Sequence, residues 1–223
     1  MNPLPWSYSA LDTFKTCPRQ YHWKYVLKNK EPDSQAIIYG NEVHKAFEDR
    51  MGVGTPLPEH LKDHEPFMQQ LDALPGIHNT EQKIALDVNR KPCNFFDKGV
   101  WFRGVVDFIH IDSADAKATI IDYKTGKPHK KFDQLQLFAL HTFALYPNVD
   151  TVETGFYWTK TKELTPMFYR RNDAKQLWKP FIPDLLQYAD AFETDTWQAR
   201  QSGLCREWCP VTSCEFNGKY RGK

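Results

Sequence analysis

Apolar positions, many of them β-branched or aromatic, gather in five short stretches of the chain. This pattern predicts five strands, over residues 80–88, 100–111, 118–124, 152–159 and 166–170. Short connections join the first three strands, which is typical of an antiparallel meander. Together with the helical stretches between and around them, they predict an α/β (α+β) fold, with a mixed central β-sheet flanked by helices.

Helical spacing marks the segments that flank the predicted strands. Residues 132–146 are apolar nearly all round, which predicts a helix buried against the sheet. Ser9 to Asp12 reads as a capping box that opens a short helix, and the helix ends near Cys17 because a proline follows. Further helices are expected over residues 19–27, 40–51 and 173–197, the last one kinked or split by prolines, and residues 52–75 are expected to be a loop with one short helix.

The hairpin formed by residues 100–111 and 118–124 carries the main candidate chemistry. Folding it about its midpoint, between Ala114 and Asp115, places Asp107 opposite Asp122, with Cβ atoms about 4.5–5.5 Å apart. Two carboxylates at that separation repel one another unless a divalent cation lies between them, and hard oxygen ligands suit Mg²⁺ or Mn²⁺. Lys124 shares the face of Asp122, so the pattern favours phosphodiester cleavage, although solvated charges on an exposed sheet would look the same.

Composition narrows the class of protein. The 223 residues fit one large domain, with or without a small appendage, and the net charge of +1 does not by itself favour DNA. Two local basic clusters are either phosphate contacts or solvated faces: Lys15, Arg19, Lys24, Lys28 and Lys30, then Lys124, Lys127, Lys130 and Lys131.

Neither a membrane segment nor a secretory signal is apparent, because no apolar run approaches about 18 residues and the N-terminus lacks a basic region before an apolar core. A cytoplasmic location is therefore expected, in the host cytoplasm if the gene is a phage's. In that reducing compartment, the five cysteines are expected to be ligands or free thiols rather than disulfides.

Three of the cysteines, Cys205, Cys209 and Cys214, lie close together near the C-terminus. Such triplets usually bind zinc or an iron–sulfur cluster. A fourth thiolate could come from Cys17 or from Cys93. Cys17 would clip the first twenty residues to the last twenty.

Taken together, these residues resemble the PD-(D/E)XK nuclease superfamily, specifically its RecB-like iron–sulfur branch, which includes CRISPR-associated RecB-like exonucleases, AddB-type nuclease domains and phage relatives. The matching motifs, in chain order, are Cys17, the histidine element from Gly40 to His44, Gly104-Val105-Val106-Asp107, Asp122-Tyr123-Lys124, Gln134 to Phe138, and the C-terminal cysteine triplet. Two features depart from the family pattern: Phe138 replaces a common tyrosine, and the first gap of the triplet is one residue longer than usual.

The resemblance implies a restriction-endonuclease-like core in a single domain over residues 1–223, with residues 1–30 and 198–223 forming a cluster-binding subdomain. It implies that Asp107, Asp122, His44 and the Tyr123 carbonyl bind Mg²⁺ or Mn²⁺. Lys124 would activate the attacking water, and Gln134 would orient the centre. Weaker assignments are Glu81 as a further ligand and Arg19, Lys24, Lys127 and Lys130 as substrate contacts, with Tyr21, Trp23 and Tyr25 as possible stacking partners of a strand.

The implied activity is that of a metal-dependent deoxyribonuclease, an exonuclease acting on DNA ends or single strands. A 4Fe–4S cluster is implied at Cys17, Cys205, Cys209 and Cys214, with Zn²⁺ as the alternative. Recombination or CRISPR-adaptation proteins are the implied partners. Two other functions stay open: a non-cutting module that binds DNA ends or partner proteins, and a zinc-stabilised interaction protein with idle hairpin acids.

Overall fold

The computed structural model describes residues 3–219 and divides the chain into two compact units. One unit is Asp33–Trp178, and the other combines Met1–Pro32 with Lys179–Lys223. The second unit therefore reaches further back into the C-terminal half than the predicted segments 1–30 and 198–223. In the described part of the chain, no helix has the length and apolar character needed to span a membrane.

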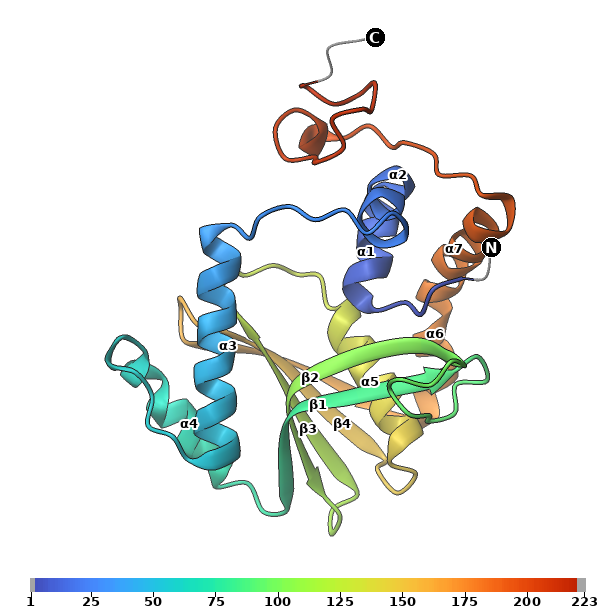
Figure 1. Cartoon of the computed structure of the whole chain (residues 1–223). Helices are drawn as coiled ribbons and strands as arrows, with labels where there is room; N and C mark the ends of the chain where they lie inside the picture. The colour runs from blue at the N-terminus through green and yellow to red at the C-terminus, as the bar shows by residue number, and fades with distance from the viewer. Residues whose placement is uncertain (1–2, 220–223) are drawn as a thin grey trace. The chain divides into compact units, whose positions relative to one another are not determined.

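A five-stranded sheet forms the frame of the Asp33–Trp178 unit, in the order β1-β2-β3-β4-β5 (Figure 1). The strands are β1 Ile77–Asp87, β2 Val100–Asp112, β3 Lys117–Lys124, β4 Thr151–Trp158 and β5 Glu163–Arg170. All neighbours are antiparallel except β3 and β4, which run parallel. A parallel pair needs a crossover, and α5 (Asp133–Leu145) supplies it. The predicted mixed sheet is confirmed.

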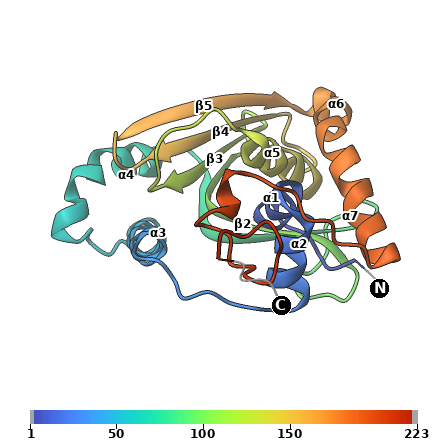
Figure 2. The ribbon, with the colours of Figure 1, turned by 90° about the horizontal axis from the view of Figure 1, so that it is seen from above.

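Helix α5 is apolar on almost every side and packs against the sheet. It contacts β1, β3, β4 and β5, and Figures 1 and 2 show it lying against the strands. Leu135, Leu137 and Ala139 are fully buried there. This burial agrees with the helix predicted over residues 132–146.

Helix α3 (Gln35–Val53) contributes a second core cluster within the same unit. Its residues Val43, Phe47 and Met51 lie at helical spacing and pack against Tyr123 of β3 and neighbouring side chains. The helix begins five residues before the predicted start, where the Ser34 side chain accepts a hydrogen bond from the backbone N–H of Ile37.

Two segments of the chain differ from the sequence prediction, and a third agrees with it. Residues 52–75 hold two consecutive helical segments rather than one, the 3-10 helix Glu59–His64 (η2) and α4 Glu65–Asp72, because Leu61, Met68 and Leu71 are buried in the α3 cluster. Ser7, not Ser9, caps the first helix by accepting from the N–H of Ala10. The helical region after residue 173 is split as predicted, into α6 (Ala174–Trp178), a 3-10 turn Lys179–Phe181 (η4) and α7 (Ile182–Thr194).

The other unit is built from α1 (Tyr8–Thr16), α2 (Pro18–Tyr21), the π-helical turn His22–Val26 (η1) and α7. An aromatic core joins them, in which Tyr21 and Tyr188 share a hydrogen bond of 2.6 Å between their hydroxyl oxygens. Phe14 packs edge-on against both rings. Tyr21 is therefore a buried core residue, so the prediction that it stacks on a DNA strand is wrong.

Candidate active site and cysteine site

Strands β2 and β3 part at the candidate active site. Their ladder runs from Asp112↔Lys117 to Phe108↔Ile121, which confirms the predicted hairpin midpoint. One step further the ladder ends, and the Asp107 carboxylate Oδ2 accepts the backbone N–H of Tyr123 at 2.8 Å. A buried side chain thus satisfies an N–H group that the sheet leaves without a strand partner.

Three potential metal ligands converge at this fork. The Nδ1 atom of His44 lies 3.3 Å from Oδ1 of Asp107, and ligand atoms of His44, Glu81 and Asp107 all lie within 4.8 Å of one another. The set combines one imidazole nitrogen with carboxylate oxygens, which suits Mg²⁺ or Mn²⁺. Glu81, the weakest of the metal candidates in the sequence, belongs to this group.

Glu81 has an unusual backbone conformation for a residue inside a strand. Its φ angle is +48°, in the left-handed region, while its neighbours Thr80 and Gln82 pair regularly with β2. For a residue with a Cβ this conformation costs about 1–2 kcal/mol. Strained backbone of this kind often accompanies functional sites, where surrounding contacts maintain it.

Asp122 is held in a separate hydrogen-bonded group beside the three ligands. Lys124 Nζ lies 2.5 Å from its Oδ2 atom, and Gln134 Nε2 donates to its Oδ1 atom at 2.7 Å. Lys124 also donates to Gln134 Oε1 at 2.9 Å, which closes the group. Asp107 therefore meets His44 and Glu81, while Asp122 meets the lysine and the glutamine. The sharing of one cation by Asp107 and Asp122 stays a prediction.

Charges in the group of His44, Glu81 and Asp107 and in the group of Asp122, Lys124 and Gln134 influence one another's pKa values. Burial raises the pKa of Asp122 to about 6, and the charge of Asp107 adds to that effect while Lys124 opposes it. Burial, then Asp107, also raises the pKa of Glu81. Burial lowers the pKa of His44, but its hydrogen bond to Asp107 and the charges of both aspartates outweigh this, so the pKa lies above its usual value. Negative charge is therefore crowded here, and a divalent cation fits the donor set.

An open groove leads to the three ligands. Its walls come from α3, β1, β2 and the residue after β3, and are formed by Ala36, Ile37, Gly40, Asn41, His44, Lys45, Glu48, Glu81, Val105, Asp107 and Thr125. Lys127 and Lys130 are exposed in the loop that connects β3 to α5. The groove gives solvent and ligands access to His44, Glu81 and Asp107.

The other two predicted substrate contacts lie in the unit of the chain ends and have local partners. Arg19 forms an ion pair with Glu215 and a hydrogen bond to the Cys214 sulfur. Lys24 is exposed, with its Nζ atom 5.3 Å from the centre of the Tyr25 ring. In this structure the Arg19 side chain therefore contacts the cysteine site.

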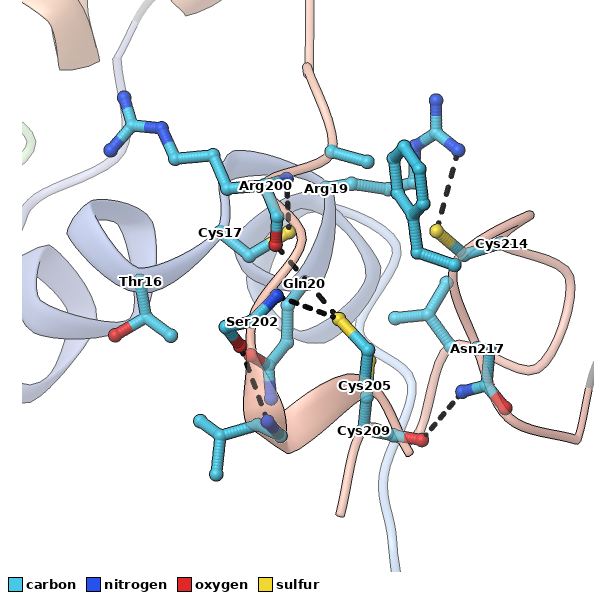
Figure 3. Close-up of a pocket in the computed structure, with 14 residues that line it drawn as sticks. Thr16, Cys17, Arg19, Gln20, Arg200, Ser202, Cys205, Cys209, Cys214 and Asn217 are labelled. Carbon is cyan, nitrogen blue, oxygen red and sulfur yellow. Dashed lines mark hydrogen bonds between the residues drawn. The ribbon is translucent and has the colours of Figure 1, made fainter. Parts of the chain in front are cut away.

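Four cysteines line one pocket of that unit: Cys17, Cys205, Cys209 and Cys214 (Figure 3). Burial raises the pKa of the Cys209 thiol, and the other three cysteines add to the increase. Cys93 lies between β1 and β2 in the Asp33–Trp178 unit, where its N–H donates to the Ala85 carbonyl. Of the two candidates for a fourth member, Cys17 is the one beside the triplet.

Local backbone structure presents these sulfurs. Cys17 stands in extended conformation between α1 and α2, with Pro18 as the first residue of α2. The C-terminal loop folds back on itself, because Gly218 N–H donates to the Cys205 carbonyl and the Asn217 side chain donates to the Cys209 carbonyl. A Cβ at Gly218 would lie 2.3 Å from the Arg206 carbonyl oxygen, so this close approach requires glycine.

Three N–H donors point at the sulfurs (Figure 3). The backbone N–H of Arg200 donates to Cys17 Sγ and that of Ser202 to Cys205 Sγ, each at 3.4 Å. The Arg19 guanidinium donates to Cys214 Sγ at 3.6 Å. Donors of this kind stabilise thiolates, the form of cysteine that binds metals.

The chain is similar to solved structures of other proteins. A solved structure described as "Putative exonuclease" from Eubacterium rectale is similar to the chain, with a TM-score of 0.58 and 11% identity, covering 98% of this chain and 89% of that one. A second, the protein SSO0001, has a TM-score of 0.48 and 13% identity, over 92% and 84% of the two chains. A search of curated proteins finds no matching relative.

The family comparison is decisive because it covers nearly the whole sequence. The family model of the PD-(D/E)XK nuclease superfamily matches residues 5–214. This match includes the fork between β2 and β3, the groups around Asp107 and Asp122, and all four cysteines of the pocket. The chain belongs to the PD-(D/E)XK nuclease superfamily.

Proposed function

We propose that the protein is a metal-dependent deoxyribonuclease that acts as an exonuclease on DNA ends or single strands. The observation that carries the proposal is the convergence of His44, Glu81 and Asp107 beside the group of Asp122, Lys124 and Gln134. The fold-level similarity to a structure described as an exonuclease agrees with this choice. Recombination or CRISPR-adaptation partners stay a prediction.

Some residues where β2 and β3 part would bind the cation, and others would position the reacting groups. His44, Glu81 and Asp107 would hold Mg²⁺ or Mn²⁺, joined by Asp122 and the Tyr123 carbonyl. The bound cation would supply a nucleophilic water at neutral pH and neutralise charge on the phosphate. Lys124 would place its ammonium beside the water and the scissile phosphate. Gln134, bonded to both Asp122 and Lys124, would keep those two side chains in position.

We further propose that Cys17, Cys205, Cys209 and Cys214 bind a 4Fe–4S cluster. The four sulfurs line one pocket, and N–H groups donate to three of them, which suits the thiolate ligands of such a cluster.

The nuclease proposal is tested by digestion of end-labelled single- and double-stranded DNA with Mg²⁺, with Mn²⁺ and with EDTA. The matched variants are Lys124→Ala and Lys160→Ala, the second in an exposed turn between β4 and β5. We expect cutting that needs a divalent cation, falls at least about 100-fold in Lys124→Ala and is unchanged in Lys160→Ala. Undiminished cutting by Lys124→Ala would place the catalytic centre elsewhere. Tight DNA binding without hydrolysis under any divalent cation would support the non-cutting module instead.

The cluster proposal is tested by anaerobic purification followed by iron, sulfide and zinc analysis. We expect a brown protein with about four iron and four sulfide per chain, the content of one cubane cluster. A colourless protein that contains stoichiometric zinc would show that the cysteines form a zinc site.

A further inference from the structure

Two cationic side chains, Lys83 and Arg103, contact the ring of Phe95. All three belong to the β1–β2 hairpin at one edge of the sheet. Lys83 Nζ is 5.9 Å from the centre of the Phe95 ring, and the Arg103 guanidinium carbon is 5.4 Å from the same centre. Lys83 also lies 5.4 Å from the centre of the Phe96 ring. Neither cation forms an ion pair with any carboxylate of the described residues. Two like charges held together in this way attract an anion, and the aromatic rings beside them offer flat apolar surface.

The same strands lead from this cluster to the candidate active site. Lys83 pairs with Val105 across β1 and β2, and Val105 lines the groove that reaches Asp107. Arg103, Val105 and Asp107 alternate along β2 and so share one side of the strand. Arg103 is four residues from Asp107, a distance of about 14 Å along the strand. These three side chains therefore follow one another along one side of β2.

We propose that a track formed by Lys83, Phe95, Phe96 and Arg103 binds the unpaired DNA strand on one side of the bond cleaved at the metal group, which is His44, Glu81 and Asp107. Lys83 and Arg103 would contact backbone phosphates. The Phe96 side chain is 74% exposed and would stack on a base. This inference rests on the proposed nuclease function, since it assigns the substrate path of that site.

An unpaired strand fits this surface better than a duplex. Along its length, an unpaired strand presents base faces to aromatic side chains, whereas a duplex does so only at its ends. Aromatic stacking beside positive charge is the usual means of binding single strands without sequence preference. Phe95 and Phe96 lie edge to face with ring centres 5.2 Å apart, so one ring is fixed by the other while Phe96 stays accessible. The track therefore provides both charge and stacking.

Binding is measured by fluorescence anisotropy with a labelled single strand of about 16 nucleotides, in EDTA so that no cleavage occurs. The variants are Lys83→Ala, Arg103→Gln and Phe96→Ala. Lys160→Ala and Phe168→Ala are the controls, because both residues are exposed at the β4–β5 hairpin, on the opposite edge of the sheet. We expect each track variant to weaken binding about tenfold and the controls to bind as wild type does.

Salt dependence separates the two kinds of interaction. Removal of Lys83 or Arg103 should reduce the slope of log affinity against log salt by about 0.7 for each phosphate that the variant no longer neutralises. Phe96→Ala should weaken binding without changing that slope. Wild-type affinity in all three variants, or equal losses in the two controls, would overturn the proposal. Thermal melting checks the fold, and the exposed Lys83→Ala and Phe96→Ala variants decide the outcome if Arg103→Gln fails to fold.

A small substrate tests the proposed nuclease function separately from the proposed binding track. The p-nitrophenyl ester of thymidine monophosphate can reach the metal group but not the track. We expect track variants to cleave it as wild type does while their kcat/KM on the long strand falls about tenfold. If wild type cleaves neither substrate but the anisotropy differences persist, the proposed nuclease function is wrong and the binding track stands.

Discussion

Asp122 illustrates how a single buried carboxylate depends on its neighbours. Only 3% of the residue is exposed, and its two oxygens meet the Lys124 ammonium and the Gln134 amide. A buried charge that loses its partners costs several kcal/mol of folding free energy, so these two contacts stabilise the ionised carboxylate in the core. The same three residues would then serve structure and chemistry together.

His141 shows the opposite case, a buried residue without charge. Its Nδ1–H donates to the Leu137 carbonyl one turn earlier in α5, and its ring stacks on Phe102 with centres 3.6 Å apart. Burial lowers its pKa to about 3. The histidine is therefore neutral in the folded protein at every ordinary pH.

We predict that His141 makes the fold sensitive to acid. The unfolded chain binds a proton at His141 near pH 6.5 and the folded chain does not, so stability is retained above that pH and falls as pH drops towards 3. Between about pH 7.5 and pH 5 the loss should be about 2 kcal/mol. The His141→Asn variant keeps a donor to the Leu137 carbonyl but cannot take up the proton. In urea unfolding, the free energy of unfolding should therefore fall by about 2 kcal/mol more in wild type than in His141→Asn between these two pH values.

The control for that prediction is His60→Asn, because His60 is about half exposed. It shows how far the removal of a histidine from the surface, where His60 pairs with Glu42, changes the pH profile. Parallel pH profiles for wild type and His141→Asn would mean that another group is responsible for acid sensitivity.

At the scale of elements, one side chain completes the C-terminal end of α5. Arg171 donates to the carbonyls of Phe143, Tyr146 and Val149, at 2.8, 2.6 and 2.8 Å. The last carbonyls of a helix have no partner within it, and a cation there also complements the helix dipole. Arg171 directly follows β5, so these hydrogen bonds hold the end of the crossover helix α5 to the end of the edge strand β5.

We predict that Arg171→Met lowers the free energy of unfolding by about 3 kcal/mol, since several charge-assisted hydrogen bonds are removed at a partly buried site. Arg171→Lys should lie between wild type and Arg171→Met, because it keeps the charge but not the fork of donors. The neighbouring Arg170→Met, at an exposed position, should be close to wild type in the same urea titration. Equal effects at positions 170 and 171 would rule out the capping role.

The left-handed residue in β1 yields a second prediction at this scale. Glu81→Gly removes both the carboxylate and the strain at φ +48°, whereas Glu81→Gln removes the charge alone. We expect both variants to bind Mn²⁺ more weakly in calorimetry, and the glycine variant to be more stable than the glutamine variant by about 1 kcal/mol. If Glu81→Gln were the more stable of the two, the backbone at this position would not be strained.

For the whole molecule, the distribution of cysteines matters most. Cys17 and the C-terminal triplet come from segments separated by more than half of the chain, yet line one pocket. A bound cluster would therefore link the two ends of the chain through covalent ligands, and its binding energy would add to the stability of that unit.

We predict that Cys17→Ser loses the cluster and that Cys93→Ser keeps it. Limited proteolysis should then cut Cys17→Ser within residues 198–219 while leaving residues 33–178 intact, because the sheet unit has its own core. Iron content and the fragment pattern are the measurements. Full iron content in Cys17→Ser would mean that Cys17 is not a ligand.

Much of the fold was predictable because its signals are local. Strand periodicity and the polar turn at residues 112–117 located the β2–β3 hairpin and its register, and an apolar sequence on all sides identified α5. The errors also have local causes. Ser7 and Ser9 are equally good caps by composition, and the second helical segment of residues 52–75 is stabilised by burial against α3, which no local pattern reports.

The sequence by itself determined the family motifs, the strands that carry them and the residue types able to bind a cation or a cluster, because these depend on side-chain chemistry and on short-range periodicity. Only the tertiary structure decided that β2 and β3 part at Asp107, that Glu81 lies beside His44 and Asp107, and that Cys17 lies beside the triplet. Those choices depend on contacts between residues far apart in the chain, and their energies appear only when the elements pack together.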